Sequence, residues 1–190
     1  RCRNSSLVDS NGGLNGLQLE VIYDGLVGFG AHRSMAEKGQ FIGRLGDILE
    51  PAKLREVLMK LKDLSITSVQ LEDIEGDARI LYETLSSKAT GLTADGSSFY
   101  TGATKTMNFI FPELFVIDDR HVTKTVNKYY PEVYGESFKV FMGIMKVCRD
   151  ELMEWQEVYG NTDSLLKKDE RPTTLIRIFD KCAFIGDVEG

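Results

Sequence analysis

Residues 100–130 read YTGATKTMNFIFPELFVIDDRHVTKTVNKYY, and this stretch predicts two short helices joined by an apolar turn. The first helix is indicated by apolar residues at helical spacing, namely Ala103, Met107, Ile110 and Phe111. Thr101 and Thr104, near its start, are residues that commonly cap helices. Pro112 ends the helix, because proline has no N–H and disfavours helical backbone in the residue before it.

The turn, residues 113–117, is apolar at four of its five positions, so we expect it to enter the core. Asp118 is expected to be the N-cap of the second helix. The buried face of that helix is predicted to carry Val122, Val126 and Tyr129. Lys105 lies about 200° around the first helix from Ala103, which places it off the apolar stripe. The stretch therefore combines a lysine with acidic residues at the start of the next helix.

The chain as a whole has the composition of one globular domain. Its 190 residues are enough for a sizeable core, and we expect a flexible arm at residues 1–13 and a single helical domain at residues 14–190. The net charge of −6 gives no general attraction to nucleic acid or to anionic membranes. No apolar run approaches the length of a membrane span and no signal peptide is recognisable, so we expect a cytoplasmic protein without a membrane partner.

The three cysteines, Cys2, Cys148 and Cys182, are widely spaced and form no CxxC motif. This spacing argues against a disulfide framework and against a cysteine-ligated metal. We therefore expect neither a metal nor another cofactor. Cys148 and Cys182 lie within apolar helical patterns and are predicted to be small buried hydrophobic residues.

Apolar periodicity predicts further helices before this stretch. Residues 14–29 fit either a strand or a helix, and we favour a helix because no convincing strand partner follows. Shorter helices are expected around residues 41–49, from Pro51 as the first helical residue, and after Asp77 as a cap. A flexible polar loop is expected between them and the central stretch, at residues 86–98.

After the central stretch, the longest helix is predicted to begin near Glu136 and to stop at Gly160. Pro172 is expected to open a last helix that ends at Gly186. Its inward face is predicted to consist of Leu175, Ile178, Phe179, Cys182 and Ile185. The complete pattern predicts an all-α fold of about seven or eight helices in one domain.

Short signatures of nucleotide-binding loops, zinc proteases and serine hydrolases are absent from the sequence. The group with a plausible mechanism is Lys105 with Asp118 and Asp119. An unprotonated lysine amine is a nucleophile, and a carboxylate stabilises positive charge that develops on a sugar ring. The structural alternative is a solvated lysine beside aspartates that simply cap a helix.

Two runs within the stretch form a recognisable pattern, Gly102-Ala103-Thr104-Lys105-Thr106, continuing to Asn108, and Asp119-Arg120-His121-Val122. The pattern resembles the lysine helix and the D-x-H-[VI] element of helix-hairpin-helix DNA glycosylases. A K-x-x-x-F-x-x-P-x-x-F stretch is similar to that of the smaller oxoguanine-glycosylase-fold proteins, and it is formed by Lys105, Phe109, Pro112 and Phe115. The predicted last helix resembles that of the smaller group through Leu175, Asp180 and Gly186. The resemblance implies a DNA-glycosylase-like helical bundle.

The resemblance also implies roles for individual residues. Lys105 is implied as the nucleophile at the anomeric carbon, and Asp119 as the carboxylate that assists it, because Asp119 has the D-x-H register. Asp118, His121 and Asn108 are further supporting positions. The implied reaction excises a damaged or oxidised base flipped out of duplex DNA, through a Schiff base that permits strand cleavage by β-elimination.

Three departures from the family favour an alternative, a non-catalytic helical module that binds nucleic acid or a protein partner. Residues 97–102 read SSFYTG in place of the glycine hairpin that binds a DNA phosphate. Lys105 and Asp119 are 14 residues apart, a shorter interval than we expect for the superfamily. The chain is also acidic, whereas phosphate contacts supply much of the affinity for DNA.

Six aromatic residues are candidates for stacking on a flipped base, although core packing is favoured for each. They are Phe99, Tyr100, Phe109, Tyr129, Tyr130 and Trp155.

Overall fold

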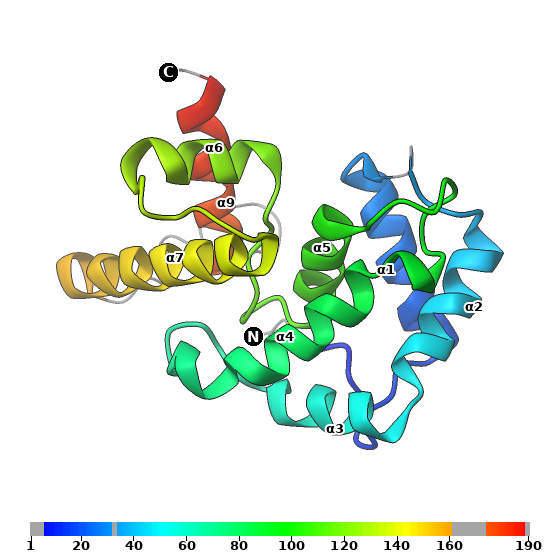
Figure 1. Ribbon diagram of the computed structural model, residues 1–190. Coiled ribbons are helices and arrows are strands. Elements are labelled where there is room, and N and C mark those ends of the chain that lie inside the picture. The colour runs from blue at the N-terminus through cyan, green and yellow to red at the C-terminus, as the bar shows by residue number, and fades with distance from the viewer. Residues whose placement is uncertain (1–5, 32–33, 161–173, 189–190) are drawn as a thin grey trace.

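Helix α5 (Tyr100–Ile110) lies near the middle of the molecule, with other helices on both sides of it (Figure 1). The computed structural model describes residues 6–31, 34–160 and 174–188. The other elements in these ranges are α1 (Gly16–Gly28), α2 (Lys38–Leu49), α3 (Ala52–Leu61), α4 (Leu71–Ser86), the 3-10 helix η2 (Lys88–Thr90), α6 (Arg120–Tyr129), α7 (Ser137–Tyr159) and α9 (Leu175–Val188). The predicted all-α fold is confirmed, and residues 14–29, which fit two kinds of structure, contain a helix.

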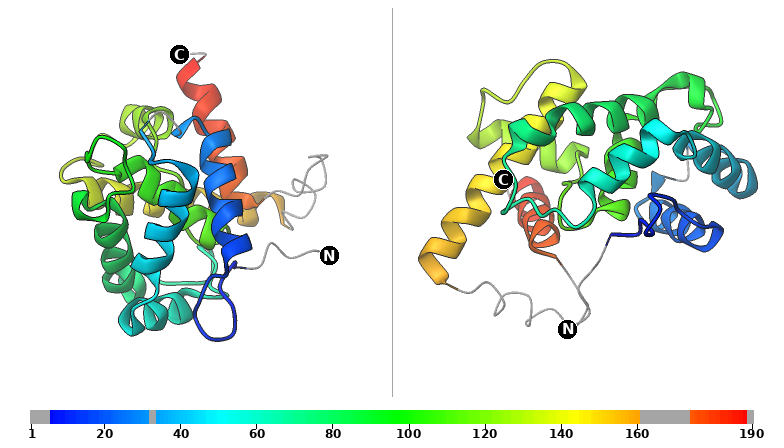
Figure 2. Two further views of the ribbon diagram at one scale, coloured as in Figure 1. Left: turned by 90° about the vertical axis from the view of Figure 1, so that its right-hand side faces the viewer. Right: turned by 90° about the horizontal axis from the view of Figure 1, so that it is seen from below.

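The helices form two groups joined by the segment between α5 and α6 (Figures 1 and 2). Helices α1 to α5 make up one group, in which α4 packs on α5 and on α3, and α1 packs on α2 and α5. Helices α6, α7 and α9 make up the other, and α6 packs chiefly on α9. Contacts of α4 with α7 connect the groups. The apolar side chains of both groups form one continuous core.

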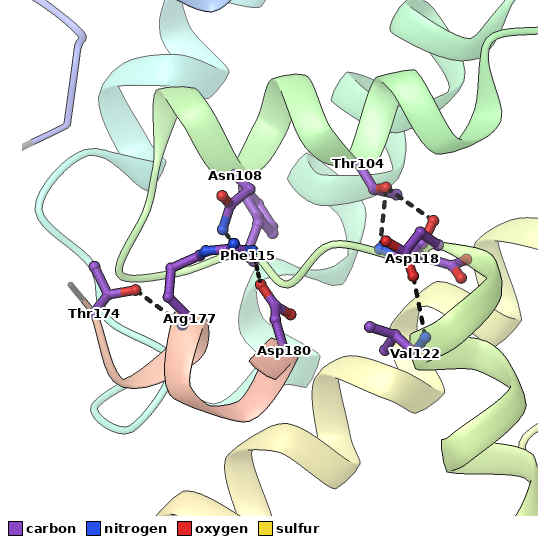
Figure 3. A network of polar contacts seen from close by, with 9 residues as sticks. Thr104, Asn108, Phe115, Asp118, Val122, Thr174, Arg177 and Asp180 are labelled. Atoms are coloured by element: carbon purple, nitrogen blue, oxygen red, sulfur yellow. Dashed lines mark hydrogen bonds and ion pairs between the residues drawn. The ribbon is translucent and has the colours of Figure 1, made fainter. Parts of the chain in front are cut away.

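Helix α5 is buried on nearly all sides, and this corrects the expectation that Lys105 lies off its buried face. Every residue from Gly102 to Asn108 is buried, Lys105 included. Helices α1 and α4 pack on α5, and the segment at residues 111–119 returns along it and is hydrogen-bonded to it through Thr104 and Asn108 (Figure 3). The α1 backbone also comes close, because a Cβ atom on Gly25 would lie 2.3 Å from the Phe109 ring.

Several predicted helix boundaries need adjustment. Asp77 does not cap a helix, because α4 begins six residues earlier and carries acidic residues in its own first turn. Thr101 and Thr104 lie inside α5 and make no N-cap, and Pro51 occupies the N-cap position of α3 instead of its first turn. The limits predicted for the longest helix are confirmed, since Glu136 and Gly160 are the two residues that flank α7.

The polar loop before α5 is held in place by backbone hydrogen bonds. The Ala36 N–H donates to the Leu92 carbonyl and the Ala94 N–H donates to the Ser34 carbonyl, both at 2.9 Å. These bonds surround an isolated antiparallel bridge between Met35 and Thr93. The loop is therefore fixed against the start of α2, in contrast to the flexibility expected from its composition.

The described part of the predicted N-terminal arm, residues 6–13, also contacts the core. Val8 is buried, and the Leu7 N–H donates to the Ile110 carbonyl at the end of α5 at 3.0 Å. Asp9 closes a turn by accepting from the backbone of Asn11 and Gly13. Residues 1–5 lie outside the described residues.

The inward face of α9 differs from the predicted face. Ile176, Phe179 and Ala183 are buried, whereas Cys182 and Ile185 are exposed, so the prediction was wrong for these last two. The physical reason for Ile185 is that its side of α9 borders a pocket instead of the core. The predicted start of this helix, Pro172, lies outside the described residues, and the helix continues past Gly186. Cys148 is buried as expected, while Tyr129 on α6 is exposed.

Candidate active site

Lys105 projects from the middle of α5 towards the end of α1. Its ammonium donates a hydrogen bond to the Phe29 carbonyl at 3.2 Å and lies 5.5 Å from the centre of the Phe29 ring. The residue is 7% exposed, which is unusual because lysine rarely loses its hydration without a partner. Burial lowers the pKa of Lys105, the negative charge of Asp119 opposes this effect, and the positive charge of Arg177 adds to it. Lys105 is therefore more easily deprotonated than a surface lysine.

Asp119 is the N-cap of α6. Its Oδ1 accepts hydrogen bonds from the backbone N–H groups of His121 at 3.0 Å and Val122 at 3.1 Å. The extended backbone of Asp119, with φ −117° and ψ 174°, is the conformation that an N-cap requires. The side chain is half-buried and its orientation is fixed by the helix it caps. Its carboxylate therefore adds a negative charge, held in position, at the start of α6.

Asp118, which the sequence suggested as the cap, has a different role. Its carboxylate accepts a hydrogen bond from the Thr123 hydroxyl. Its backbone N–H donates to the Thr104 hydroxyl at 3.2 Å (Figure 3). Burial raises the pKa of Asp118, although the Thr123 bond opposes the change. Asp118 faces a separate shallow hollow beside Arg120 and Lys124. It is a neighbour of the candidate carboxylate and ties the returning segment to α5.

Lys105 and Asp119 open into one pocket. The cavity has a volume of about 550 Å³, within the range of ~300–1,000 Å³ that small-molecule sites occupy. Phe29 at the end of α1, helices α5, α6 and α9, and the segment before α6 all contribute to it. The lining residues are Phe29, Lys105, Ile117, Asp119, His121, Val122, Arg177, Asp180, Lys181 and Ile185. Three basic side chains and two carboxylates thus line the pocket of an acidic protein.

The two remaining supporting positions differ in their placement. His121 lines the pocket next to Asp119. Asn108 does not, because its side-chain amide is buried and donates to the Phe115 carbonyl at 2.6 Å (Figure 3). Asn108 holds the returning segment against α5 and has no direct access to a ligand in this pocket.

A second charged pair lines the pocket from α9. The Arg177 guanidinium donates to Asp180 Oδ2 at 2.8 Å, and it lies 4.7 Å from the centre of the same Phe29 ring that Lys105 contacts. Asp180 is 6% exposed. Burial raises the pKa of Asp180 to about 6, although the charge and hydrogen bond of Arg177 oppose the shift.

The aromatic residues singled out as possible base-stacking groups do not line this pocket. Phe99 is buried against the Phe41 ring, and Tyr129 is exposed on α6. The aromatic side chain at the pocket is Phe29, which sequence reasoning missed together with Arg177. Phe29 follows α1, 76 residues before Lys105, and no spacing rule connects the two.

Comparison of the chain with protein families, with curated proteins and with solved structures returned no match. In the ranges that the structure describes, no cluster of His, Cys, Asp and Glu side chains is arranged to hold a metal ion. Nor does any helix within those ranges have the length and apolar character needed to cross a bilayer. The chemistry of the pocket therefore has to be argued from its own side chains.

Proposed function

We propose that this protein is a DNA glycosylase with lyase activity, which uses Lys105 as the nucleophile and Asp119 as the assisting carboxylate. The observation that supports the proposal is the common pocket of these two residues. A lysine needs both desolvation and access to a ligand to act as a nucleophile. Lys105 is largely buried yet lines an open cavity, and a carboxylate lines the same cavity.

The first step makes one bond and breaks another. The lone pair of Lys105 Nζ attacks the sugar C1′ while the bond from C1′ to the base breaks, and its electron pair leaves with the base, which takes a proton from water. Positive charge develops on the sugar in this transition state. The Asp119 carboxylate stabilises that charge, and its orientation is already set by the two backbone N–H groups that it caps.

The later steps release the enzyme. Loss of a proton from the amine and cleavage of the C1′–O4′ bond, with protonation of O4′, give the Schiff base. Removal of a C2′ proton then expels the 3′ phosphate by β-elimination. Water finally hydrolyses the imine and restores the Lys105 amine.

The charges that line the pocket are consistent with a nucleic-acid ligand. With Lys105 as the free amine, Arg177 and Lys181 balance Asp119 and Asp180 there, whereas the whole chain has a net charge of −6. Basic groups near the site are needed because phosphates flank a flipped nucleotide on both sides. The acidic remainder of the chain predicts weak binding that falls steeply as the salt concentration rises.

Borohydride trapping tests the proposal. Duplex oligonucleotides that contain an abasic site or an oxidised purine are incubated with the protein and sodium borohydride, which reduces a Schiff base to a stable covalent adduct. We expect an adduct with the wild-type protein and none with Lys105→Ala. Lys128→Ala, which removes an exposed lysine from α6, is the matched control and is expected to keep the adduct.

The same assay separates the proposal from a non-catalytic module. Failure of the wild-type protein to form an adduct with any of these substrates at low salt would refute the proposed glycosylase and lyase activity. Binding of the oligonucleotides without an adduct would indicate a nucleic-acid-binding module, and absence of binding would favour a protein partner.

A further inference from the structure

Two cations are held at one aromatic ring in this pocket. The Lys105 ammonium lies 5.5 Å from the centre of the Phe29 ring, and the Arg177 guanidinium lies 4.7 Å from it. The π electrons of the ring attract each cation, and the two positive charges repel one another. An arginine free to choose its position would move away from a second cation and into water, so something must retain Arg177.

Asp180 is the group that retains it. The two residues are three positions apart on α9, and the Asp180 carboxylate accepts from the Arg177 guanidinium at 2.8 Å. Asp180 is almost completely buried, whereas the Arg177 side chain is 30% exposed. Phe29 is itself supported from behind, because its ring packs edge to face with Phe109 on α5 at 5.7 Å. The position of the guanidinium is therefore set by a buried carboxylate and a supported ring.

We propose that Arg177 is a positioning residue for Lys105, anchored by Asp180 so that a second cation stays at the Phe29 ring that the reactive amine contacts. The inference rests on the proposed function, because a nearby cation serves a purpose only if Lys105 reacts as a free amine. A cation next to a lysine makes protonation of the amine less favourable. Arg177 suits this role because a guanidinium remains charged at every pH at which the enzyme works.

The other groups that face Lys105 have opposing effects. Asp119 on α6 favours the protonated ammonium, and the Phe29 carbonyl accepts a hydrogen bond from it. His121 on α6 and Lys181 on α9 line the same pocket, and Asp180 is paired with Arg177. Among the charges on α9, Arg177 is the one that lowers the pKa of Lys105, and it acts in the same direction as burial.

A lysine titration measured by NMR tests the inference without DNA. Protein labelled with ¹³C at lysine Cε is titrated from pH 7 to pH 11, and the Lys105 signal is assigned by its loss in Lys105→Ala. Arg177→Met removes the charge and keeps an apolar side chain on Phe29. We expect it to raise the pKa of Lys105 by roughly 0.5–1 unit, the effect of one like charge in a partly solvated site.

Three variants serve as controls for this titration. Arg177→Lys keeps a cation and is expected to leave the pKa of Lys105 close to its wild-type value. Lys128→Gln removes a charge from an exposed part of α6 and is expected to have no effect. The double variant Arg177→Met/Asp180→Asn avoids an unpaired buried carboxylate and is expected to raise the pKa of Lys105 in the same direction, so the test does not depend on one variant.

Trapping on an abasic-site oligonucleotide gives the second measurement. For Arg177→Met we expect a rate roughly three- to tenfold below wild type at pH 7, recovered at higher pH, as a 0.5–1 unit shift of the amine requires. An unchanged Lys105 titration in Arg177→Met and in the double variant would overturn the inference, whatever the trapping result. If the titration shifts but the wild-type protein forms no adduct, the proposed function is overturned. The effect of Arg177 on Lys105 then has no catalytic role.

Discussion

Replacement of Asp180 by asparagine tests whether burial raises the pKa of this carboxyl group in the folded protein. The pKa of Asp180 is raised from 3.8 to about 6, with burial as the main cause and Arg177 opposing it. A carboxyl group whose pKa is higher in the folded state binds more protons there than in the unfolded state. Its contribution to stability is therefore fully present below pH 3.8 and is lost as the pH rises through about 6.

The size of the effect follows from the shift. About two units at 1.36 kcal/mol per unit give a total of roughly 3 kcal/mol, of which about 2 kcal/mol fall between pH 4 and pH 7. In the Asp180→Asn variant this pH dependence is absent, because the amide does not ionise. We therefore expect the free energy of unfolding of the wild-type protein to fall by about 2 kcal/mol relative to Asp180→Asn across this range.

Urea denaturation followed by circular dichroism measures this difference. Low protein concentrations are needed between pH 4.5 and 5.5, because the sequence pI is about 5.1. Asp47→Asn, at an exposed position on α2, is the control and is expected to parallel the wild type. If the difference between wild type and Asp180→Asn stays constant from pH 4 to pH 7, the carboxylate is solvated and the reasoning about its burial is refuted.

Three further substitutions test individual contacts. Gly102→Ala would place a Cβ atom 2.1 Å from a neighbouring aromatic ring and is expected to lower stability by ~1–3 kcal/mol in thermal unfolding. Gly43→Ala, in open space on α2, is the control and is expected to raise stability by ~0.5–1 kcal/mol. Equal effects of the two substitutions would contradict the close packing around α5. Asn108→Ala leaves the Phe115 carbonyl without its hydrogen-bond partner and is expected to lower stability by ~1–3 kcal/mol. The folded variant is expected to form the adduct. A stable variant that forms no adduct would show that Asn108 acts on the ligand. Asp119→Asn keeps a capping side chain, so its stability is expected to stay within ~0.5 kcal/mol of wild type while its trapping rate falls at least about tenfold. Asp119→Ala is expected to lose ~1 kcal/mol of stability as well. A wild-type trapping rate in Asp119→Asn would exclude a role for the negative charge.

The helices of this protein could be predicted from the sequence because their apolar residues recur at helical spacing. Boundaries were predicted well where a flanking residue was distinctive, as at Gly160, and poorly where a common residue suggested a cap. Asp77 is such a case, since an aspartate inside a helix has the same sequence appearance as one that precedes it. The expectation that Lys105 lies off the buried face of its helix was wrong because a helical stripe describes one helix alone. Its burial comes from segments that pack on α5 from elsewhere in the chain.

The candidate site could be predicted only in part for a related reason. Lys105 and Asp119 were identified from a local pattern within one stretch, and the structure brings both to one pocket. Phe29 and Arg177 lie far away in the sequence on either side, and only the packing of α1 and α9 around α5 brings them there. Neither residue carries a local signal, because a phenylalanine at a helix end and an arginine on an amphipathic helix are both ordinary.

The position of the covalent bond is the most direct test of the account. The borohydride-reduced adduct with an abasic-site oligonucleotide is digested with nuclease and trypsin, and mass spectrometry locates the sugar remnant on the chain. We expect the remnant on the Lys105 side chain. The modification blocks tryptic cleavage between Lys105 and Thr106, so the modified peptide contains both residues. A remnant on any other lysine or on the terminal amine, with Lys105 unmodified, would contradict the claim that the buried amine of α5 is the nucleophile.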